Sequence, residues 1–318
     1  MESQEPQNGS KLLLFAFLII ALIGVNFFFG FEYSRKGSTL TASISDKPDT
    51  QVAYFFPISE PNYLPIYNPD ITPPNIDAKS ILIYDLRSGR SLYEKNSSAR
   101  LPVASLTKIM SAVIVLENYN ISDIVTVTGD AVKVDGERQE LYEGERISVE
   151  SLLKMMLIES SNDAAYALAQ YAKSRDINFI DEMNKKASQL KMHDSYFNDP
   201  AGLNDSAYST ADDLSKLTKF ALAFPLIWET MTQKDLIVES IDEKIKHITK
   251  NTNLLLGVIP NIIGGKTGYT DSALGCLVLV VEISEENDNM VSVVLGSNDR
   301  FGDTEKLVNW IKRAYRWE

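Results

Sequence analysis

Three short polar motifs supply the residue types of a serine nucleophile and its helpers. The first holds Ser105 and Lys108, the second holds Ser160 and Asn162, and the third is Lys266-Thr267-Gly268. A serine hydroxyl is a poor nucleophile until a neighbouring base takes its proton. On a helix, side chains three residues apart share a face, so Lys108 can reach Ser105. Lysine acts as a base only when it is partly neutral, which burial and a nearby cation such as Lys266 favour.

The order of the motifs matters more than any one of them. The Ser-x-x-Lys pattern occurs three times, at Ser105, Ser151 and Ser188, whereas Ser-x-Asn and Lys-Thr-Gly occur once each. Only the Ser105 copy precedes both other motifs with room for whole structural elements between them. Ser160-Ser161-Asn162 is also an ordinary helix N-cap sequence, and both interpretations can hold together.

Composition excludes several classes of function. The chain has 318 residues, 44% of them hydrophobic, and a net charge of −12, which argues against a nucleic-acid partner. The single cysteine, Cys276, excludes an intrachain disulfide, and its apolar surroundings predict a buried side chain. His193 and His247 lack ligand-like spacing, so we expect no metal site and no cofactor.

The N-terminal part predicts an anchor and a connector. Residues 12–31 carry no charge and extend about 30 Å as a helix, enough to cross a bilayer core. A cleaved signal peptide is the alternative, but the run is long and no good cleavage site follows it. Residues 1–11 are expected to be cytoplasmic. Residues 32–75 form a proline-rich connector whose aromatic side chains suggest that part of it packs on the following domain.

Residues 76–318 alternate strand and helix patterns and show no second globular domain. Residues 80–86 and 91–94 predict a hairpin around a glycine turn. Helices are expected over 105–118, over 149–173 with a break near Ser160, over 210–224, and at the C-terminal end. Strands are expected over 274–283 and 290–297.

With their flanking residues, these motifs resemble the low-molecular-mass penicillin-binding proteins of the D-alanyl-D-alanine carboxypeptidase family. The resemblance covers residues 76–318 and includes Asn198-Asp199-Pro200-Ala201-Gly202-Leu203, read as a structural loop near the cleft. One departure is Ser161, where the family usually has glycine. The resemblance implies an α/β (α+β) fold of the serine β-lactamase and penicillin-binding transpeptidase type. In that fold, helices flank an antiparallel sheet, and a helical subdomain carries the Ser160 motif.

The resemblance also implies roles for individual residues. Ser105 would be acylated, Lys108 would be its base, and Ser160 would relay a proton to the leaving amine. Lys266 would supply positive charge, and the backbone N–H groups of Ser105 and Tyr269 would form an oxyanion hole. The implied substrate-binding residues are Asn162, Lys266, Thr267, Gly268, Tyr269 and Arg300.

The implied activity is a serine-type carboxypeptidase that removes the terminal D-alanine from peptidoglycan pentapeptides, with β-lactams as covalent inhibitors. A β-lactamase, a peptidoglycan endopeptidase and a non-catalytic β-lactam sensor or wall-binding module are the alternatives. Positive charges flank residues 12–31 on both sides, so orientation is nearly tied on charge. The wall substrate lies outside the membrane, which predicts a single-pass cell-membrane protein with an extracytoplasmic catalytic domain.

Overall fold

The computed structural model describes residues 64–134, 141–283 and 288–317. The predicted anchor at 12–31 lies outside these residues. Within the described ranges, no helix is both long enough and apolar enough to traverse a bilayer.

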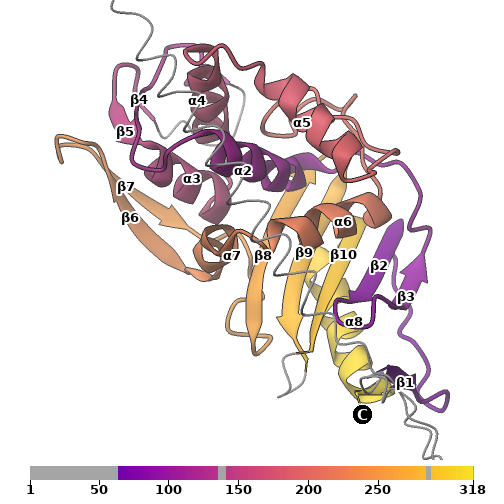
Figure 1. The fold of residues 1–318 in the computed structure, drawn as a ribbon. Helices are drawn as coiled ribbons and strands as arrows, with labels where there is room; N and C mark the ends of the chain where they lie inside the picture. Colours follow the sequence, from indigo (N-terminus) through magenta and orange to yellow (C-terminus); the bar gives the residue numbers. More distant parts are fainter. Residues whose placement is uncertain (1–63, 135–140, 284–287, 318) are drawn as a thin grey trace, which may run out of the picture. The chain divides into compact units, whose positions relative to one another are not determined.

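A five-stranded antiparallel sheet forms the centre of the domain. Its strand order is β3-β2-β10-β9-β8 (Figure 1). The strands are β2 (Ser80–Asp85), β3 (Ser91–Lys95), β8 (Ile262–Thr270), β9 (Leu274–Glu282) and β10 (Asn289–Ser297). Strands β9 and β10 are buried along almost their whole length, which explains their continuous apolar sequences. Cys276 is fully buried in β9, as its surroundings predicted, and burial raises the pKa of its thiol to about 11.

Helices cover both faces of this sheet. On one face lies α8 (Arg300–Ala314), whose Leu307 and Trp310 belong to one hydrophobic core (Figure 1). On the other face lie α2 (Thr107–Asn118), α6 (Ala211–Ala221) and α7 (Pro225–Thr232), which share the larger core. The two cores explain why the strands between them are apolar on both sides.

A helical subdomain continues from α2 and contains the second motif. It includes β4 (Ile124–Thr126), β5 (Arg146–Ser148), α3 (Val149–Ile158), α4 (Asn162–Lys173) and α5 (Phe179–Gln189). The predicted break near Ser160 is confirmed, since α3 ends at Ile158 and α4 begins at Asn162. Ser161 caps α4 by accepting a hydrogen bond from the Ala164 N–H, so the N-cap interpretation of this triplet is also correct.

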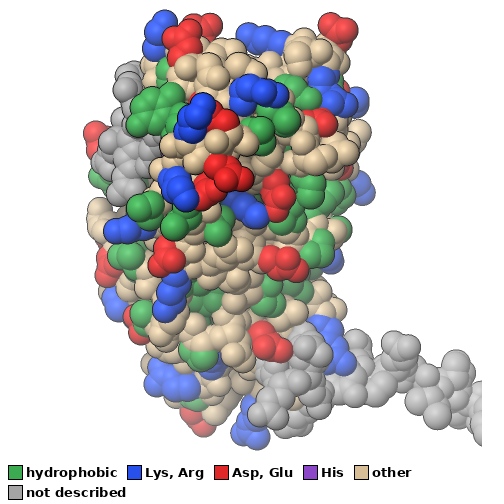
Figure 2. Space-filling view, turned by 90° about the vertical axis from the view of Figure 1, so that its left-hand side faces the viewer, with side chains coloured by type: hydrophobic (Ala, Val, Ile, Leu, Met, Phe, Trp, Pro, Cys, Tyr) green, Lys and Arg blue, Asp and Glu red, His purple; other side chains and the backbone are tan. Residues whose placement is uncertain are grey.

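A second hairpin projects beside the helical subdomain. It consists of β6 (Asp235–Glu239) and β7 (Lys246–Lys250). Lys250, the last residue of β7, lines a cleft that Ser105 also lines. His247 Nε2 lies 2.7 Å from Glu145 Oε1, and both side chains are buried, which ties the hairpin to the segment before β5. Figure 2 views the molecule from this side. Acidic, basic and hydrophobic side chains are intermixed there, so the net charge of −12 is not gathered into one patch on this face.

Part of the predicted connector packs on the domain, as its aromatic side chains suggested. Strand β1 (Pro65–Tyr67) pairs with β11 (Tyr315–Trp317) at the end of the described chain. The Tyr67 ring lies 6.1 Å from the Trp310 ring and 5.1 Å from the Tyr315 ring, measured between centroids. Trp310 Nε1 donates a hydrogen bond of 3.0 Å to Ile71 O. The first strand of the domain therefore lies inside the stretch assigned to the connector.

Replacing Tyr67 should weaken this attachment. We expect Tyr67→Ala to lower the free energy of unfolding by about 1 to 2 kcal/mol, because two aromatic contacts are lost. Ile66→Ala is the control, since Ile66 is 55% exposed in the same strand. Denaturant unfolding measures both changes, and equal effects of the two substitutions would contradict this account of the contact.

Candidate active site

A cleft opens where the edge strand β8 meets the start of α2 and the break between α3 and α4. Its volume is about 470 Å³. The residues that line it are Ser105, Glu159, Ser160, Ser161, Asn162, Gly202, Leu203, Lys250, Asn251, Thr252, Thr267, Gly268, Tyr269, Thr270 and Arg300. Seven of the nine residues predicted for the site line this cleft. The other two, Lys108 and Lys266, are buried and contact the lining residues Ser105 and Ser160.

Ser105 and Lys108 adopt the arrangement that their spacing predicted. Ser105 lies in a short 3-10 turn, Ala104–Leu106, that leads directly into α2. We call these three residues the nucleophile turn. Lys108 is fully buried, and its Nζ lies 2.8 Å from Ser105 Oγ, 2.7 Å from Asn162 Oδ1 and 3.1 Å from Ala201 O. The amine thus contacts the candidate nucleophile and two further oxygens.

These contacts orient the neutral form of the amine. A neutral lysine amine has two N–H donors and one lone pair, while an amide oxygen and a backbone carbonyl only accept. When Asn162 Oδ1 and Ala201 O take the two N–H groups, the lone pair points at Ser105 Oγ. The Ser105 hydroxyl then donates to Lys108 Nζ, the direction that removal of its proton requires.

Burial makes that neutral form accessible near neutral pH. It lowers the pKa of Lys108 to about 7, while the negative charge of Asp199 acts in the opposite direction. Burial also lowers the pKa of Lys266, and the charges of Lys108 and Arg300 lower it further. Burial was the correct part of the sequence expectation. For Lys108, the charge that contributes is the Asp199 carboxylate, rather than the cation Lys266.

Ser160 and Lys266 form the second contact of the site. Lys266 Nζ donates a hydrogen bond of 2.8 Å to Ser160 Oγ and another of 3.0 Å to Thr267 O. Ser160 has a φ of +68°, which places its side chain in the gap between α3 and α4. A non-glycine residue in this left-handed region is strained, and such strain is found at functional sites.

The third motif lies on β8 as predicted, with its glycine close to the nucleophile turn. A Cβ at Gly268 would come within 2.9 Å of Val103 O and 3.0 Å of Ser105 N. The absence of a side chain at Gly268 therefore allows the turn that carries Ser105 to approach β8 closely. Thr267 Oγ1 lies 2.6 Å from Thr252 Oγ1, and both residues line the cleft.

Arg300 lies at the start of α8 and reaches the rim of the cleft. Its guanidinium donates to Gly268 O at 3.3 Å and lies 6.0 Å from the centre of the Tyr269 ring. Its Nε is buried without a hydrogen-bond partner among the described residues. Partial burial lowers the pKa of Arg300. Tyr269 itself is 58% exposed at the end of β8.

Sequence reasoning missed several residues of the cleft. Lys250 is the last residue of β7, Asn251 and Thr252 follow it, and no motif marked any of the three. Glu159 is the one acidic side chain among the described lining residues, and it precedes Ser160 directly. Residues 198–203 were predicted to form a structural loop near the cleft. The loop also takes part in the site, because Ala201 contacts Lys108 and Gly202 lines the cleft.

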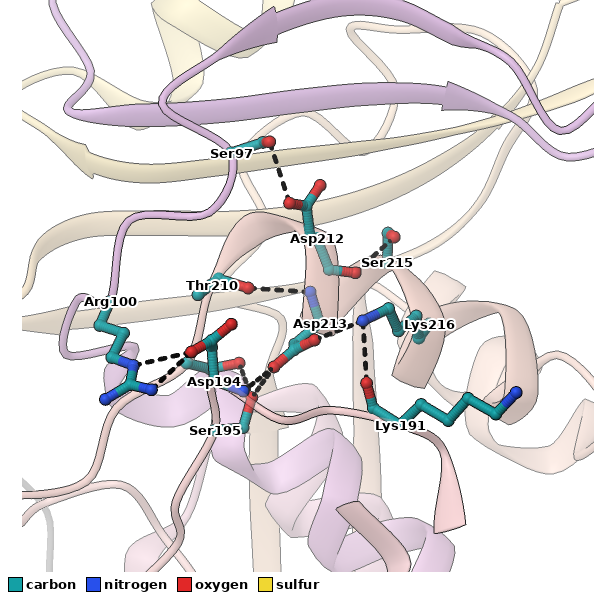
Figure 3. A network of polar contacts seen from close by, with 11 residues as sticks. Ser97, Arg100, Lys191, Asp194, Ser195, Thr210, Asp212, Asp213, Ser215 and Lys216 are labelled. Carbon is teal, nitrogen blue, oxygen red and sulfur yellow. Dashed lines mark hydrogen bonds and ion pairs between the residues drawn. The ribbon is translucent and has the colours of Figure 1, made fainter. Parts of the chain in front are cut away.

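A polar network joins the segment that precedes the nucleophile turn to two other segments of the chain (Figure 3). The buried Asp213 carboxylate accepts hydrogen bonds from Ser195 Oγ at 2.8 Å and from Lys216 Nζ at 2.7 Å. Arg100 pairs with Asp194, and Ser97 Oγ donates to Asp212 at 3.1 Å. The segment before Ser105, the segment before the 198–204 loop, and the first turn of α6 are thereby joined.

The comparisons with known proteins agree with this geometry. A sequence profile described as D-alanyl-D-alanine carboxypeptidase matches residues 68–299. The D-alanyl-D-alanine carboxypeptidase DacF of Bacillus subtilis is 34% identical over 249 residues, which are 75% of this chain and 63% of DacF. The chain therefore spans less than two thirds of that relative's length.

Two further relatives are covered more fully. The D-alanyl-D-alanine endopeptidase of Pseudomonas aeruginosa is 30% identical over 239 residues, which are 73% of this chain and 76% of the endopeptidase. The crystal structure of the Streptomyces K15 DD-transpeptidase superposes with a TM-score of 0.70 at 30% identity. The superposed region covers 76% of this chain and 99% of the transpeptidase.

Gly202 provides a test of how tightly the nucleophile turn is held. A Cβ at Gly202 would lie 1.9 Å from Ala104 O, and the residue has a φ of +78°. We expect Gly202→Ala to slow penicillin acylation by more than ~100-fold, because displacing reacting groups by about 1 Å has that order of effect. Gly144→Ala is the matched control, with a φ of +82° and no atom within 4 Å of the added Cβ. Acylation as fast in Gly202→Ala as in Gly144→Ala would contradict the contact.

Proposed function

Since this chain belongs to the D-alanyl-D-alanine carboxypeptidase family, we propose that it removes the terminal D-alanine from peptidoglycan pentapeptides. The observation that carries the proposal is the 2.8 Å contact between Ser105 Oγ and the buried amine of Lys108. A serine with a partly neutral lysine beside it is equipped for nucleophilic attack on a carbonyl carbon. β-Lactams are the expected covalent inhibitors.

The first step transfers the acyl group to Ser105. Lys108 accepts the hydroxyl proton while Oγ forms a bond to the carbonyl carbon of the scissile peptide. The bond to the terminal D-alanine nitrogen then breaks, and that nitrogen needs a proton. Ser160 Oγ is assigned to relay it: the hydroxyl gives its proton to the nitrogen and takes a replacement from the Lys266 ammonium, which donates to Ser160 Oγ. Water subsequently hydrolyses the ester at Ser105.

The cationic groups around the cleft suit a substrate that ends in a carboxylate. Lys250 and Arg300 line the cleft, and Lys266 lies just beneath its surface. A bound carboxylate would raise the pKa of Lys266, because an opposite charge favours the protonated amine. We assign Asn162 and Thr267 to the substrate backbone, the backbone N–H groups of Ser105 and Tyr269 to the oxyanion, and Arg300 to the terminal carboxylate.

An endopeptidase that cuts peptide crosslinks is the second candidate. It is favoured by the Pseudomonas aeruginosa endopeptidase, of which the chain covers 76%. The two activities are separated by incubating the protein with a pentapeptide and with a crosslinked peptide dimer. Release of free D-alanine from the pentapeptide supports the carboxypeptidase. Cleavage of the dimer alone supports the endopeptidase, and fast penicillin hydrolysis without either product supports a β-lactamase.

Ser105 is the residue that should be acylated. Intact mass spectrometry after incubation with penicillin should show one adduct on the native protein and none on Ser105→Ala. Ser151→Ala is the control, because Ser151 begins another Ser-x-x-Lys sequence and lies within α3. An adduct that persists in Ser105→Ala, or that is lost in Ser151→Ala, contradicts the assignment.

The reaction should depend on the protonation of Lys108. The base must be neutral, and its pKa is lowered to about 7, so kcat/KM should rise as pH increases through about 7. At lower pH the ammonium form holds no lone pair for the Ser105 proton. D-alanine release measured between pH 5 and 9 tests this, within a range of about two pH units on each side of that pKa. A rate that still rises steeply up to pH 9, as the ordinary lysine pKa of 10.5 would require, would contradict the role of burial.

We also propose that residues 12–31 anchor the chain in the cell membrane, with the catalytic domain on the extracytoplasmic side. The support is the absence of any charge over these twenty residues. The protein should stay in the membrane fraction after an alkaline carbonate wash and keep its N-terminal residues. A mature sequence that begins near residue 43 would instead indicate a cleaved signal peptide.

A further inference from the structure

The 198–204 loop is organised by a single buried carboxylate. Asp199 Oδ1 accepts hydrogen bonds from the N–H groups of Ala201 at 2.7 Å, Gly202 at 2.6 Å and Leu203 at 3.2 Å. Its Oδ2 accepts another from the Asn204 N–H at 2.9 Å. The side chain is 6% exposed, so the turn wraps around it. Four backbone N–H groups therefore converge on one carboxylate.

The same turn makes three contacts with α2 and the turn before it, one of them with the Lys108 amine. Ala201 O accepts a hydrogen bond from Lys108 Nζ at 3.1 Å, and Pro200 O accepts one from Ser111 Oγ at 2.6 Å, one helical turn further along α2. Gly202 lies against Ala104 O, directly before Ser105. The loop that Asp199 organises therefore touches Lys108 directly and also touches Ala104, the residue before Ser105.

Asp199 also contributes a charge to the surroundings of Lys108. Its negative charge raises the pKa of Lys108 and so opposes the effect of burial. It likewise raises the pKa of Tyr166, on α4, in addition to the effect of burial. From β8 the facing charge is Lys266, and the remaining hydrogen-bond partners of Lys108, Ser105 and Asn162, are neutral. Among these described groups, Asp199 is the only one that favours the ammonium.

We propose that Asp199 is a positioning residue of the acylation step, which holds the Ala201 carbonyl against the Lys108 amine and places a negative charge near it. The carbonyl occupies one N–H of the neutral amine, so the lone pair stays directed at Ser105. The charge keeps the buried amine basic enough to take the Ser105 proton at neutral pH. This inference rests on the proposed function, because acylation of Ser105 is the step concerned.

Asp199→Asn removes the negative charge and keeps a side chain of nearly the same size and shape. Its side-chain oxygen can still accept from the Ala201, Gly202 and Leu203 N–H groups, while the negative charge and the acceptor for the Asn204 N–H are lost. In a plot of the penicillin acylation rate against pH, the acidic limb is the part in which the rate rises with pH. We expect this limb to move about one pH unit lower, because removing a nearby anion disfavours the ammonium form. The plateau rate should fall by less than ~10-fold, because the amine is then a weaker base. Asp205→Asn is the matched control, since it removes one charge from an exposed position of the same loop.

The inference is overturned if the acidic limb of Asp199→Asn coincides with that of the native protein, or if Asp205→Asn moves it equally. Asp199→Glu serves if the asparagine variant does not fold. This variant keeps the charge, so its acidic limb should stay in place. The longer side chain should disturb the turn and lower the plateau rate. An acidic limb displaced to lower pH would contradict the proposal. A native protein that forms no penicillin adduct would refute the acyl-enzyme itself, which is a different result from an unmoved limb.

Discussion

Burial of the Lys108 amine is the constraint to which the rest of the site responds. An ammonium group removed from water is destabilised, so the neutral form becomes accessible near neutral pH. A buried amine must nevertheless have its hydrogen bonds satisfied. Asn162 from α4 and Ala201 from the 198–204 loop provide two acceptors, and Ser105 provides the third contact. One amine thus couples α2, the helical subdomain and that loop.

The backbone around the nucleophile is held in conformations that few residues adopt freely. Ala104 has a φ of +48° and Ser160 has a φ of +68°, so strained residues lie on both sides of the Ser105 hydroxyl. Such conformations persist only where surrounding structure determines them. Gly268 on β8 and Gly202 in the 198–204 loop approach the Ala104 turn from two directions, with no room for a side chain on either. The sheet edge and the loop therefore fix the position of Ser105 together.

The sequence predicted the parts of this arrangement that depend on local pattern. The hairpin of β2 and β3 and the break before α4 follow from turn residues and periodicity. The meeting of the three motifs at one cleft was implied by the resemblance to the carboxypeptidase family. The sequence did not predict α7 or the β6–β7 hairpin, whose elements are short. It also did not predict α5, although the buried Phe179, Met183 and Ala187 follow one face of that helix. The roles of Asp199, Gly202 and Gly268 were not predictable either. They arise from contacts between segments far apart in the chain, such as Gly268 against the Ala104 turn.

The most direct test of this account is the titration of Lys108 itself. Protein labelled with carbon-13 at the lysine Cε positions gives one NMR resonance per lysine, and the Lys108 signal is identified by its loss in Lys108→Arg. The account predicts a titration midpoint at a pH of about 7 for this resonance. A midpoint near 10.5, the ordinary lysine value, would show that the amine is protonated at neutral pH and would contradict its role as the base.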